Sequence, residues 1–420
     1  MLRRLFQDSA VYTVATLFTT GLSFVLLPIY ARVLAPSEYG LYDYVVVLGL
    51  IVGVTVAFEV SQAVMYYLAR DADGDSGAGV IAAGFWVVVV CYGVFCLLCA
   101  MGSPWLADGL LGSRDKAGLV VVAALQFFAV ALVRVWVIVE RSVRRPRRVL
   151  AISVTSAALG GAFGVVGARS HGVEGLLLGQ LAGQGLVGLA VTVARRRDVL
   201  RRVDLDVVRR LLAFSSPLVL SSVAFILAAY VDRLFVRNLL GLEALGYYGF
   251  GARIAGGIAL LLVGFQAALS PIIYSELDRE GLHEDVARVF RIFVMAAGGA
   301  LAVLVVSADW VVGIVGDGSF APAVPVVWLL AAAALIQGSY IFFPGLYIAQ
   351  RTWTLAGIHV FGVLLNAGLN VALIHRFGLV GSGVATLVAA IAIFGLNYGL
   401  SRRYFRVPVL SRGVRTAPAE

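Results

Sequence analysis

Residues 28–44 read PIYARVLAPSEYGLYDY, and residues 234–248 read LFVRNLLGLEALGYY. In both stretches an arginine is followed by a glutamate, then by a glycine and a tyrosine, and both stretches lie between long apolar runs. Arg32 and Arg237 are 205 positions apart, and Gly40 and Gly246 are 206 apart. A motif that returns at a nearly constant offset indicates an internal duplication.

The apolar runs on either side of these motifs decide the fold class. The chain has 420 residues, of which 61% are apolar and only 14% charged, and its mean hydropathy is +0.95. Soluble domains are about 45–50% apolar and about 25% charged, and a helix needs about 20 apolar residues to cross a bilayer. We therefore expect an all-α polytopic membrane protein with twelve transmembrane helices. The expected spans are 9–31, 41–67, 80–102, 117–139, 149–168, 173–194, 211–236, 245–272, 289–308, 323–349, 355–375 and 380–400.

Several classes of protein are excluded by what the sequence lacks. The first apolar run is longer than a signal-peptide core and has no small-residue cleavage site, so we expect it to stay attached. The three cysteines fall inside the single expected helix 80–102, and the four histidines have no metal-ligand spacing. The only lysine, Lys116, lies outside any phosphate-binding loop. We expect no metal, no cofactor and no built-in ATPase.

Arginine placement predicts the orientation in the membrane. The segments ERSVRRPRR (140–148) and RRRDVLRRVDLDVVRR (195–210) connect expected helices on one side, together with the basic residues at 3–4 and 402–415. Short arginine-rich loops stay in the cytoplasm, so both termini are expected inside the cell. The net charge of +9 then matches an anionic lipid leaflet rather than a nucleic acid.

The twelve expected spans divide into two similar sets of six. The tripeptide RRL occurs at 3–5 and at 209–211, and HGVEGLLLGQL (171–181) is similar to FGLVGSGVATL (377–387), both at an offset of 206. Two units entering from the same side form a parallel repeat. We expect six-helix bundles at 1–200 and 201–400, and a disordered basic cytoplasmic tail at 401–420.

Glycine and proline predict local features of each unit. Pro36 is expected to break the helix between the first two spans, with Gly40 and Gly246 favouring a tight turn there. Gly175, Gly179 and Gly183 form a stripe at four-residue spacing, which is typical of close helix packing in lipid.

Charged side chains inside the expected spans are the candidate functional residues. Such a charge costs at least about 2.5–3.5 kcal/mol, so it usually faces a wet cavity or a partner. Arginine suits phosphate because its planar fork donates two hydrogen bonds. The buried carboxylates could carry a coupling proton or sodium ion, or neutralise arginine when substrate is absent. The substrate-binding candidates are Arg32, Arg134, Arg233, Arg237 and Arg253; the coupling or charge-pairing candidates are Glu59, Asp43 and Asp232; their polar companions are Gln62, Gln126, Gln266, Asn366, Asn370 and Asn397.

Each candidate also has a structural interpretation. Arg32, Arg233 and Arg237 lie near helix ends and Arg134 lies near the inner boundary, so all four could reach the lipid headgroups instead. Asp43 could cap its own helix. Glu59 and Arg253 lie deepest, and pairing or function is the better interpretation of both.

The order of these landmarks resembles that of bacterial polysaccharide flippases. PIYARVLAPSEYGLYDYV (28–45), YVDRLFVRNLLGLEALGYYGFGARI (230–254) and NAGLNVALIHRFGLVGSGVAT (366–386) are similar to signatures of this family, which belongs to the multidrug/oligosaccharidyl-lipid/polysaccharide exporter superfamily. The resemblance implies two bundles in a V around a central cavity, in the bacterial plasma membrane. It also implies a transporter that moves a polyprenyl-diphosphate-linked oligosaccharide to the outer leaflet, in a pathway with glycosyltransferases and a polymerase.

Other functions remain open. A multidrug exporter of the same fold is expected to carry an acidic residue well inside its first helix, and this chain has only Asp8 at the start of that helix. A lipid II flippase of the same fold is usually longer, with two further helices, so twelve expected spans argue against that function. A glycosyltransferase or polymerase would explain the Asp-x-Asp of DADGD (71–75), but no nucleotide-binding domain accompanies it. A scaffold would leave Glu59 and Arg253 unexplained.

Overall fold

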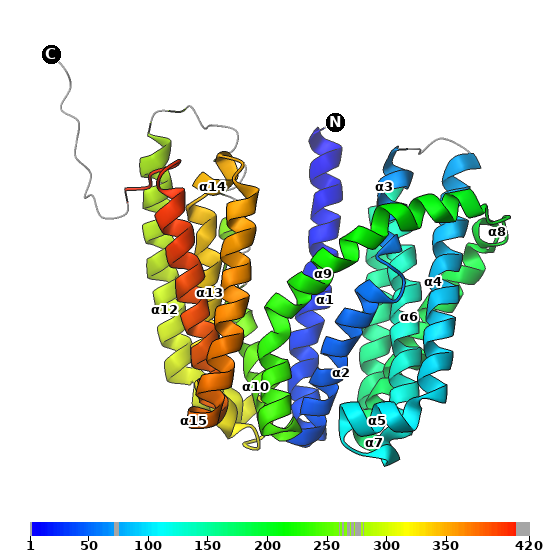
Figure 1. Ribbon diagram of the computed structural model, residues 1–420, viewed down its shortest axis with the longest axis horizontal. Coiled ribbons are helices and arrows are strands. Elements are labelled where there is room, and N and C mark those ends of the chain that lie inside the picture. Colours follow the sequence, from blue (N-terminus) through cyan, green and yellow to red (C-terminus); the bar gives the residue numbers. More distant parts are fainter. Residues whose placement is uncertain are drawn as a thin grey trace. The chain divides into compact units, whose positions relative to one another are not determined.

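The computed structural model describes residues 2–70, 75–259, 261, 262, 264–266, 269, 273, 279 and 281–408, with side chains from Phe18 onward except at 75 and 76. Most of the DADGD stretch and residues 409–420 of the expected tail lie outside this range. Every regular element in the described part of the chain is a helix (Figure 1).

The chain divides into two compact units, Met1–Leu227 and Ala228–Glu420. The division falls inside one helix, α9, so the first part of α9 belongs to the first unit. The first unit contains α1 (Leu2–Val33), α2 (Pro36–Thr55), α3 (Val60–Arg70), α4 (Asp75–Met101), α5 (Ser103–Leu111), η1 (Arg114–Lys116), α6 (Ala117–Ser142), α7 (Pro146–Ala194), α8 (Arg196–Val199) and the start of α9 (Leu205–Leu240). The second unit contains the end of α9, α10 (Leu242–Gly256), η2 (Gly257–Ala259), α12 (Leu282–Gly316), η3 (Ala321–Ala323), α13 (Val324–Gly338), η4 (Ser339–Phe342), α14 (Gly345–Ile348) and α15 (Thr352–Ser401).

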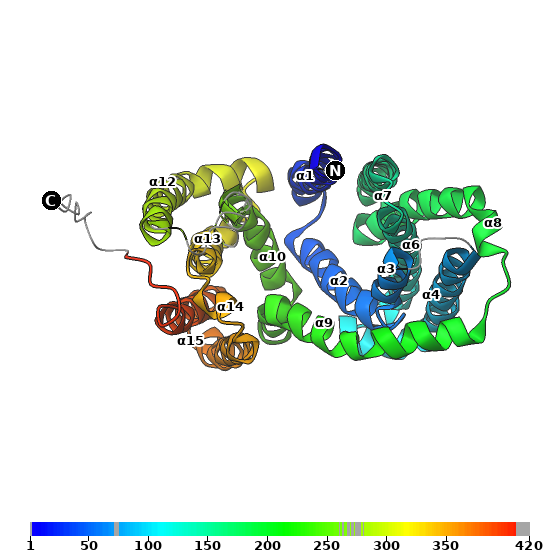
Figure 2. The same ribbon diagram turned by 90° about the horizontal axis from the view of Figure 1, so that it is seen from above.

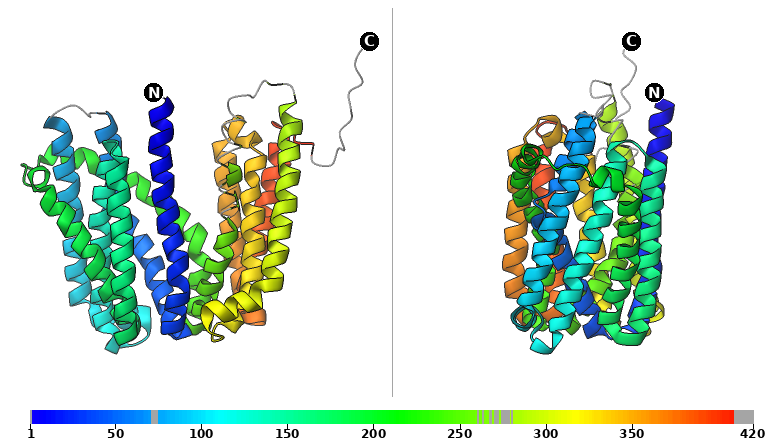
Figure 3. Two further views of the ribbon diagram at one scale, coloured as in Figure 1. Left: turned by 180° about the vertical axis from the view of Figure 1, so that it is seen from behind. Right: turned by 90° about the vertical axis from the view of Figure 1, so that its right-hand side faces the viewer.

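The helices are long and apolar enough for a membrane. Among the described residues, nine helices have the length and hydropathy needed to cross a bilayer, and Phe18–Val33 of α1 is a shorter apolar segment. Within each unit the long helices run side by side (Figure 3). The expectation of a polytopic all-α membrane protein is confirmed at this level.

Two helices contain a reversal. α7 has 49 residues and α15 has 50, about 75 Å at 1.5 Å per residue, and a bilayer core is only about 30 Å thick. Gly172 in α7 has φ 56° and ψ −138°, and Gly378 in α15 has φ 55° and ψ −135°. L-residues avoid this region, so glycine is required at both positions. The expected spans 149–168 and 173–194 are thus the two halves of α7, and 355–375 and 380–400 are those of α15.

The glycine stripe lies where the halves of α7 meet. A methyl group added to Gly175, Gly179 or Gly183 would collide with the backbone of Gly167, Phe163 or Leu159 respectively. The partner number falls as the glycine number rises, so the halves are antiparallel. The stripe therefore allows close backbone packing, as the sequence predicts.

The turn between the first two helices of each unit differs from the expected one. Pro36 is the first residue of α2, where its missing N–H costs nothing. However, Gly40 lies inside α2 and Gly246 lies inside α10. The expectation that these two glycines form the turns is wrong. In the second unit the turn residue is Gly241, with φ 89°, and in the first unit Ala35 precedes α2 in an extended conformation.

The core of the first unit joins α3, α4 and α6 and also receives the start of α9 (Figure 2). Trp136 of α6 is fully buried, and its Nε1 donates a 2.8 Å hydrogen bond to Thr192 Oγ1 of α7. Leu211 of α9 is fully buried in this core, and the rings of Phe214 and Tyr66 stack with centroids 4.6 Å apart. These contacts fix the first half of α9 to the first unit.

Candidate functional site

The expected second span, 41–67, is interrupted between residues 55 and 60. α2 ends at Thr55, α3 begins at Val60, and residues 56–59 form a turn. Phe58 has φ 50° and Glu59 has φ 51°. Left-handed conformations are unfavourable for residues other than glycine, and strain of this kind is concentrated at functional sites. The break has no glycine or proline within it, so tertiary contacts must hold it in place.

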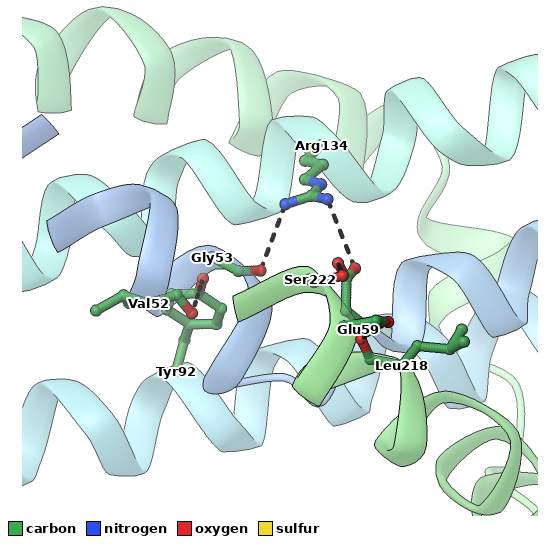
Figure 4. Close-up of polar contacts among 8 residues, drawn as sticks. Val52, Gly53, Glu59, Tyr92, Arg134, Leu218 and Ser222 are labelled. Carbon is green, nitrogen blue, oxygen red and sulfur yellow. Dashed lines mark hydrogen bonds and ion pairs between the residues drawn. The ribbon is translucent and has the colours of Figure 1, made fainter. Parts of the chain in front are cut away.

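Glu59 makes two of those contacts (Figure 4). Ser222 Oγ of α9 donates a 2.8 Å hydrogen bond to Glu59 Oε1, and Glu59 Oε2 lies 3.6 Å from Arg134 Nη2. The residue is only 5% exposed, and Oε2 has no hydrogen-bond donor among the described residues. The carboxylate is therefore enclosed, with one oxygen satisfied and the other held only by charge.

Arg134, a residue of α6, contacts both α2 and the turn between α2 and α3. Its Nη1 donates a 3.4 Å hydrogen bond to the carbonyl of Gly53 in α2, while Nη2 faces Glu59 (Figure 4). The side chain is 40% exposed. The sequence left open whether Arg134 turns toward the headgroups. In the structure it turns toward Glu59, and several guanidinium N–H groups remain available beyond these two contacts.

A cavity of about 350 Å³ adjoins Arg134, and it is lined entirely by residues of the first unit. Most of its wall is aliphatic or aromatic, and its polar lining consists of Tyr42, Ser61, Tyr92, Gln126, Arg134 and Gln180. Hydrogen bonds between helices position these groups: Gln180 Nε2 donates to Tyr42 Oη at 3.2 Å and Gln126 Nε2 donates to Gln184 Oε1 at 3.2 Å. A cavity with one cation and several neutral donors suits an anionic or sugar-like group.

Two other candidates of the first unit lie outside this cluster. Asp43 in α2 is fully buried. Arg32 is in the last turn of α1 and is exposed. Neither lines the 350 Å³ cavity.

The arginine candidates of the second unit lie in α9 and α10. Arg233 Cζ lies 4.8 Å from the centre of the Tyr230 ring, a cation–π distance. Arg237, in the last turn of α9, donates a 2.7 Å hydrogen bond from Nη1 to Asn238 Oδ1. Arg253 is half-buried in the last turn of α10.

Asp232 is the centre of a second polar cluster, which connects α9, α10 and α15. Tyr248 Oη donates a 2.5 Å hydrogen bond to Asp232 Oδ2, and Thr386 Oγ1 donates one of 3.4 Å to the same oxygen. Asn366 Nδ2 in turn donates to Thr386 Oγ1 at 3.2 Å. The arrangement places one carboxylate among hydroxyl and amide groups inside an apolar unit.

The cluster continues along the two halves of α15. Asn370 Nδ2 donates a 3.0 Å hydrogen bond to Asn366 Oδ1, and Ser382 Oγ donates one of 2.7 Å to Asn370 Oδ1. Asn370 and Ser382 are fully buried. Buried polar networks of this kind are costly unless every member is paired, so the pairing across the reversal is specific.

The sequence predicts the neutral residues Gln126, Asn366 and Asn370 of the two sites, but not four other neutral members. Ser222, Tyr248, Ser382 and Thr386 carry no charge, and the search for charges in expected spans passes over them. For Ser382 and Thr386 a signal exists: a reversal near Gly378 places them opposite the flagged Asn370 and Asn366. Ser222 has no comparable signal, because its partner Glu59 is 163 positions away.

The described residues contain no group of three or more histidine, cysteine, aspartate or glutamate side chains that could hold a metal ion.

Comparison with known proteins assigns a family. A model of the family described as "Polysaccharide biosynthesis protein" matches residues 29–325. A probable low-salt glycan biosynthesis flippase of Haloferax volcanii is 25% identical over 253 residues, which are 59% of this chain and 52% of that protein. An uncharacterized membrane protein of Methanocaldococcus jannaschii is 24% identical over 216 residues, 47% of this chain and 46% of that protein. The matches thus span about half the length of these curated relatives.

Solved structures share the fold. The lipid II flippase MurJ in an inward closed conformation gives a TM-score of 0.71 at 13% identity, covering 93% of this chain and 87% of that one. An inward-facing multidrug exporter of the MATE family gives 0.67 at 14% identity, covering 91% and 94%. Because the family model covers well over half of its length, the chain belongs to the polysaccharide biosynthesis protein family, with the membrane fold shared by flippases and exporters of the superfamily that its sequence resembles.

Proposed function

We propose that this protein is a flippase that moves a polyprenyl-diphosphate-linked oligosaccharide from the cytoplasmic to the outer leaflet by alternating access. Membership of the polysaccharide biosynthesis family and the similarity to a probable glycan biosynthesis flippase support this assignment. The substrate's membrane lipid would stay in the bilayer while its diphosphate and sugars cross through the protein. Glycosyltransferases and a polymerase of the same pathway would supply and consume the substrate.

The proposal includes twelve spans in two parallel repeats, arranged in a V around a central cavity. Counting α7 and α15 as two spans each, and adding α1, brings the nine candidate helices to twelve. Gly172 and Gly378 are 206 positions apart, as are Ala35 and Gly241, the residues that precede α2 and α10. This offset equals that of the sequence repeat. Alternating access needs two such equivalent halves that move against each other.

The observation that carries the proposal is the orientation of Arg134. Its guanidinium lines a cavity of about 350 Å³ whose wall is mostly aliphatic or aromatic. Placing a guanidinium there is costly unless it binds something. A diphosphate offers paired oxygens that match the planar fork of arginine, and amide and phenol groups in the same wall suit sugar hydroxyls. Arg32, Arg233, Arg237 and Arg253 are the further candidates for these contacts in other states of the cycle.

The expected orientation, with both termini in the cytoplasm of a bacterial cell, is part of the proposal. Support comes from the arginine-rich segments, which are ordered around one buried carboxylate. Glu140 lies 2.8 Å from Arg195, 3.6 Å from Arg148 and 3.8 Å from Arg145. Since these arginines come from both segments, Glu140 holds the two basic segments at the same end of the first unit.

Coupling to a proton or sodium gradient is assigned to the Asp232 cluster. The carboxylate of Asp232 accepts from Tyr248, Thr386 and the Arg233 backbone N–H. Together with the hydroxyl oxygens of Tyr248 and Thr386 it offers the oxygen ligands that a hard cation prefers, and it can equally accept a proton. Charged groups at this depth commonly serve as ion relays. Asp43, fully buried in α2, is the corresponding candidate in the first unit.

A cation-coupled multidrug exporter is the second candidate, favoured by the fold similarity to such exporters. The test reconstitutes the full-length protein in liposomes in two assays. The first follows leaflet exchange of a fluorescent polyprenyl-diphosphate sugar, and the second follows uptake of a cationic dye. The wild-type protein is compared with Arg134→Gln and with Arg376→Gln, a matched control at an exposed position of α15.

A flippase is expected to exchange the glycolipid, to lose at least about tenfold of its rate in Arg134→Gln (a loss of 1.36 kcal/mol corresponds to tenfold), and to keep its rate in Arg376→Gln. Dye transport without glycolipid exchange would assign the exporter function instead. Glycolipid exchange that is unchanged in Arg134→Gln would remove Arg134 from the mechanism.

A further inference from the structure

We propose that Glu59 is a resident counter-anion that occupies Arg134 in the absence of substrate and is displaced by the substrate's phosphate. The displacement would release Ser222 of α9 and the strained break between α2 and α3. Glu59 is thus a positioning residue that links headgroup binding to a change of conformation. This inference rests on the proposed function and specifies how the Arg134 site acts in it.

The geometry of the pair is that of a loose contact. A hydrogen bond between a guanidinium and a carboxylate is usually about 2.7–2.9 Å long, whereas Arg134 Nη2 and Glu59 Oε2 are 3.6 Å apart. Glu59 Oε2 receives no hydrogen bond from any described residue although it is buried. The carboxylate therefore neutralises the guanidinium without satisfying it, which leaves room for a better ligand.

The cavity is lined by Arg134 but not by Glu59. Arg134 lines the cavity and its side chain is 40% exposed, while the side chain of Glu59 is 4% exposed and Glu59 is absent from the cavity wall. An anion entering the cavity thus meets the guanidinium from the open side. A diphosphate can make two parallel charge-assisted hydrogen bonds, and a single carboxylate at 3.6 Å makes none.

The alternative to displacement is unfavourable. If Glu59 kept its position, substrate phosphate and carboxylate would share one guanidinium, and like charges at such distances repel strongly in a buried site. Without Glu59, on the other hand, the empty site would leave a partly buried guanidinium uncompensated, which is costly in a membrane protein. An exchange of one anion for another avoids both costs.

Displacement has a structural consequence because Glu59 itself is strained. Phe58 and Glu59 both have positive φ angles, and such conformations persist only when surrounding contacts over-determine them. Two side-chain contacts of Glu59, to Arg134 of α6 and to Ser222 of α9, tie the break to other helices. When the carboxylate leaves, residues 56–59 can return to a helical conformation that joins α2 to α3.

Ser222 extends the effect to α9. Its Oγ donates the 2.8 Å hydrogen bond to Glu59 Oε1, and α9 begins in the first unit and ends in the second. The same helix carries Asp232, the proposed coupling residue. Loss of the Ser222 hydrogen bond would therefore remove one of the contacts that fix α9 to the first unit.

The test measures binding of inorganic diphosphate to the full-length protein in nanodiscs by calorimetry. Glu59→Gln keeps the shape of the side chain and an acceptor for Ser222 but removes the competing charge. It is expected to bind diphosphate about tenfold more tightly than wild type (1.4 kcal/mol of lost competition corresponds to tenfold). Glu59→Asp retains the charge but withdraws it from Arg134, so its affinity should lie between the two.

Substitution of Arg134 tests whether the gain in affinity depends on the guanidinium. Arg134→Gln should abolish the gain, so that the double variant Arg134→Gln/Glu59→Gln binds no more tightly than Arg134→Gln alone. Arg376→Gln should match wild type. If Glu59 had only a structural role, Glu59→Gln would instead weaken the binding of diphosphate. Equal or weaker binding in Glu59→Gln overturns the inference, and if this variant does not fold, equal or weaker binding in Glu59→Asp does so.

The leaflet-exchange assay separates this inference from the proposed function. Tighter diphosphate binding in Glu59→Gln, in a protein that exchanges no glycolipid, would reject the flippase function and retain the counter-anion. Normal glycolipid exchange together with unchanged diphosphate affinity in Glu59→Gln would retain the function and reject the counter-anion. Under both proposals together, Glu59→Gln should bind more tightly and exchange more slowly, because substrate binding no longer triggers the release.

Discussion

Gly172 and Gly378 have the same backbone conformation at equivalent places in the two units. Their dihedral angles agree within 3°, at φ 56° and ψ −138° against φ 55° and ψ −135°. Each reverses a helix of about 50 residues, and the two glycines are separated by the offset of the sequence repeat. The same backbone conformation therefore recurs at the offset of the sequence motifs, although the sequences around the two glycines differ.

The turn at Gly378 gives a direct test of backbone strain. A Cβ added there meets no atom within 4 Å, so Gly378→Ala is expected to destabilise the protein only through its dihedral angles, by about 1–3 kcal/mol. Thermal unfolding of the purified full-length protein measures the loss. Gly395→Ala is the control, because this position also has open space but lies within the helical part of α15, where alanine is favoured by about 1 kcal/mol. Equal stability of the two variants would show that the turn tolerates side chains.

The stripe in α7 tests close packing instead. A methyl group at Gly179 would collide with the backbone of Phe163, whereas one at Gly93 in α4 meets nothing within 4 Å. Backbone cannot move aside as a side chain can, so Gly179→Ala is expected to cost about 1–3 kcal/mol, as overpacking usually does. Gly93→Ala should be neutral or stabilising. Unfolding temperatures of the two variants decide the point, and no loss in Gly179→Ala would contradict the antiparallel contact.

Much of this fold follows from the sequence because lipid imposes simple rules. Apolar runs predict the helices, and the glycine stripe predicts a place where helices approach closely. The prediction of turns at Gly40 and Gly246 is wrong, because both lie one turn inside α2 and α10, and the residue at the turn before α10 is Gly241. Sequence pattern locates a motif, but it does not distinguish a glycine that bends the chain from one that packs.

The candidate sites were predictable only in part. Depth and charge flagged Glu59, Arg134 and Asp232, and the structure brings the first two together at 3.6 Å. The break at Phe58 and Glu59 has no sequence signal, since neither glycine nor proline lies within it. Ser222 was missed for a similar reason: a serine in an apolar helix becomes informative only when its partner is known.

Glu140 should be the acidic residue of the arginine-rich end of the first unit that is most sensitive to substitution. It is 1% exposed and lies within 3.8 Å of three arginines, so Glu140→Gln would leave their charges uncompensated. Because Arg145 and Arg148 are about half exposed and hydrated, we expect a loss of about 1–3 kcal/mol rather than the full cost of a buried charge. Thermal unfolding at low and high salt measures it, and the loss should shrink in high salt as the arginines are screened.

The control for Glu140 is Glu284→Gln, at an exposed position in the first turn of α12. It should lose at most about 1 kcal/mol, the value of a charge at a helix N-terminus. A similar loss in both variants would indicate a general effect of net charge rather than the specific cluster around Glu140.

Asp232 should determine how the protein responds to an ion gradient. Asp232→Asn keeps an oxygen that can accept from Tyr248 and Thr386 but loses the acceptor of the Arg233 backbone N–H. The contacts between helices are therefore kept, but the group can neither release a proton nor attract a sodium ion. We expect the fold to be retained, and glycolipid exchange to become insensitive to imposed proton or sodium gradients. The measurement is leaflet exchange in liposomes with each gradient applied separately, with Asp309→Asn, at an exposed position of α12, as control.

Gradient dependence that survives in Asp232→Asn and disappears in Asp43→Asn would place the coupling site in the first unit, on the same helix as the carbonyl of Gly53 that accepts from Arg134.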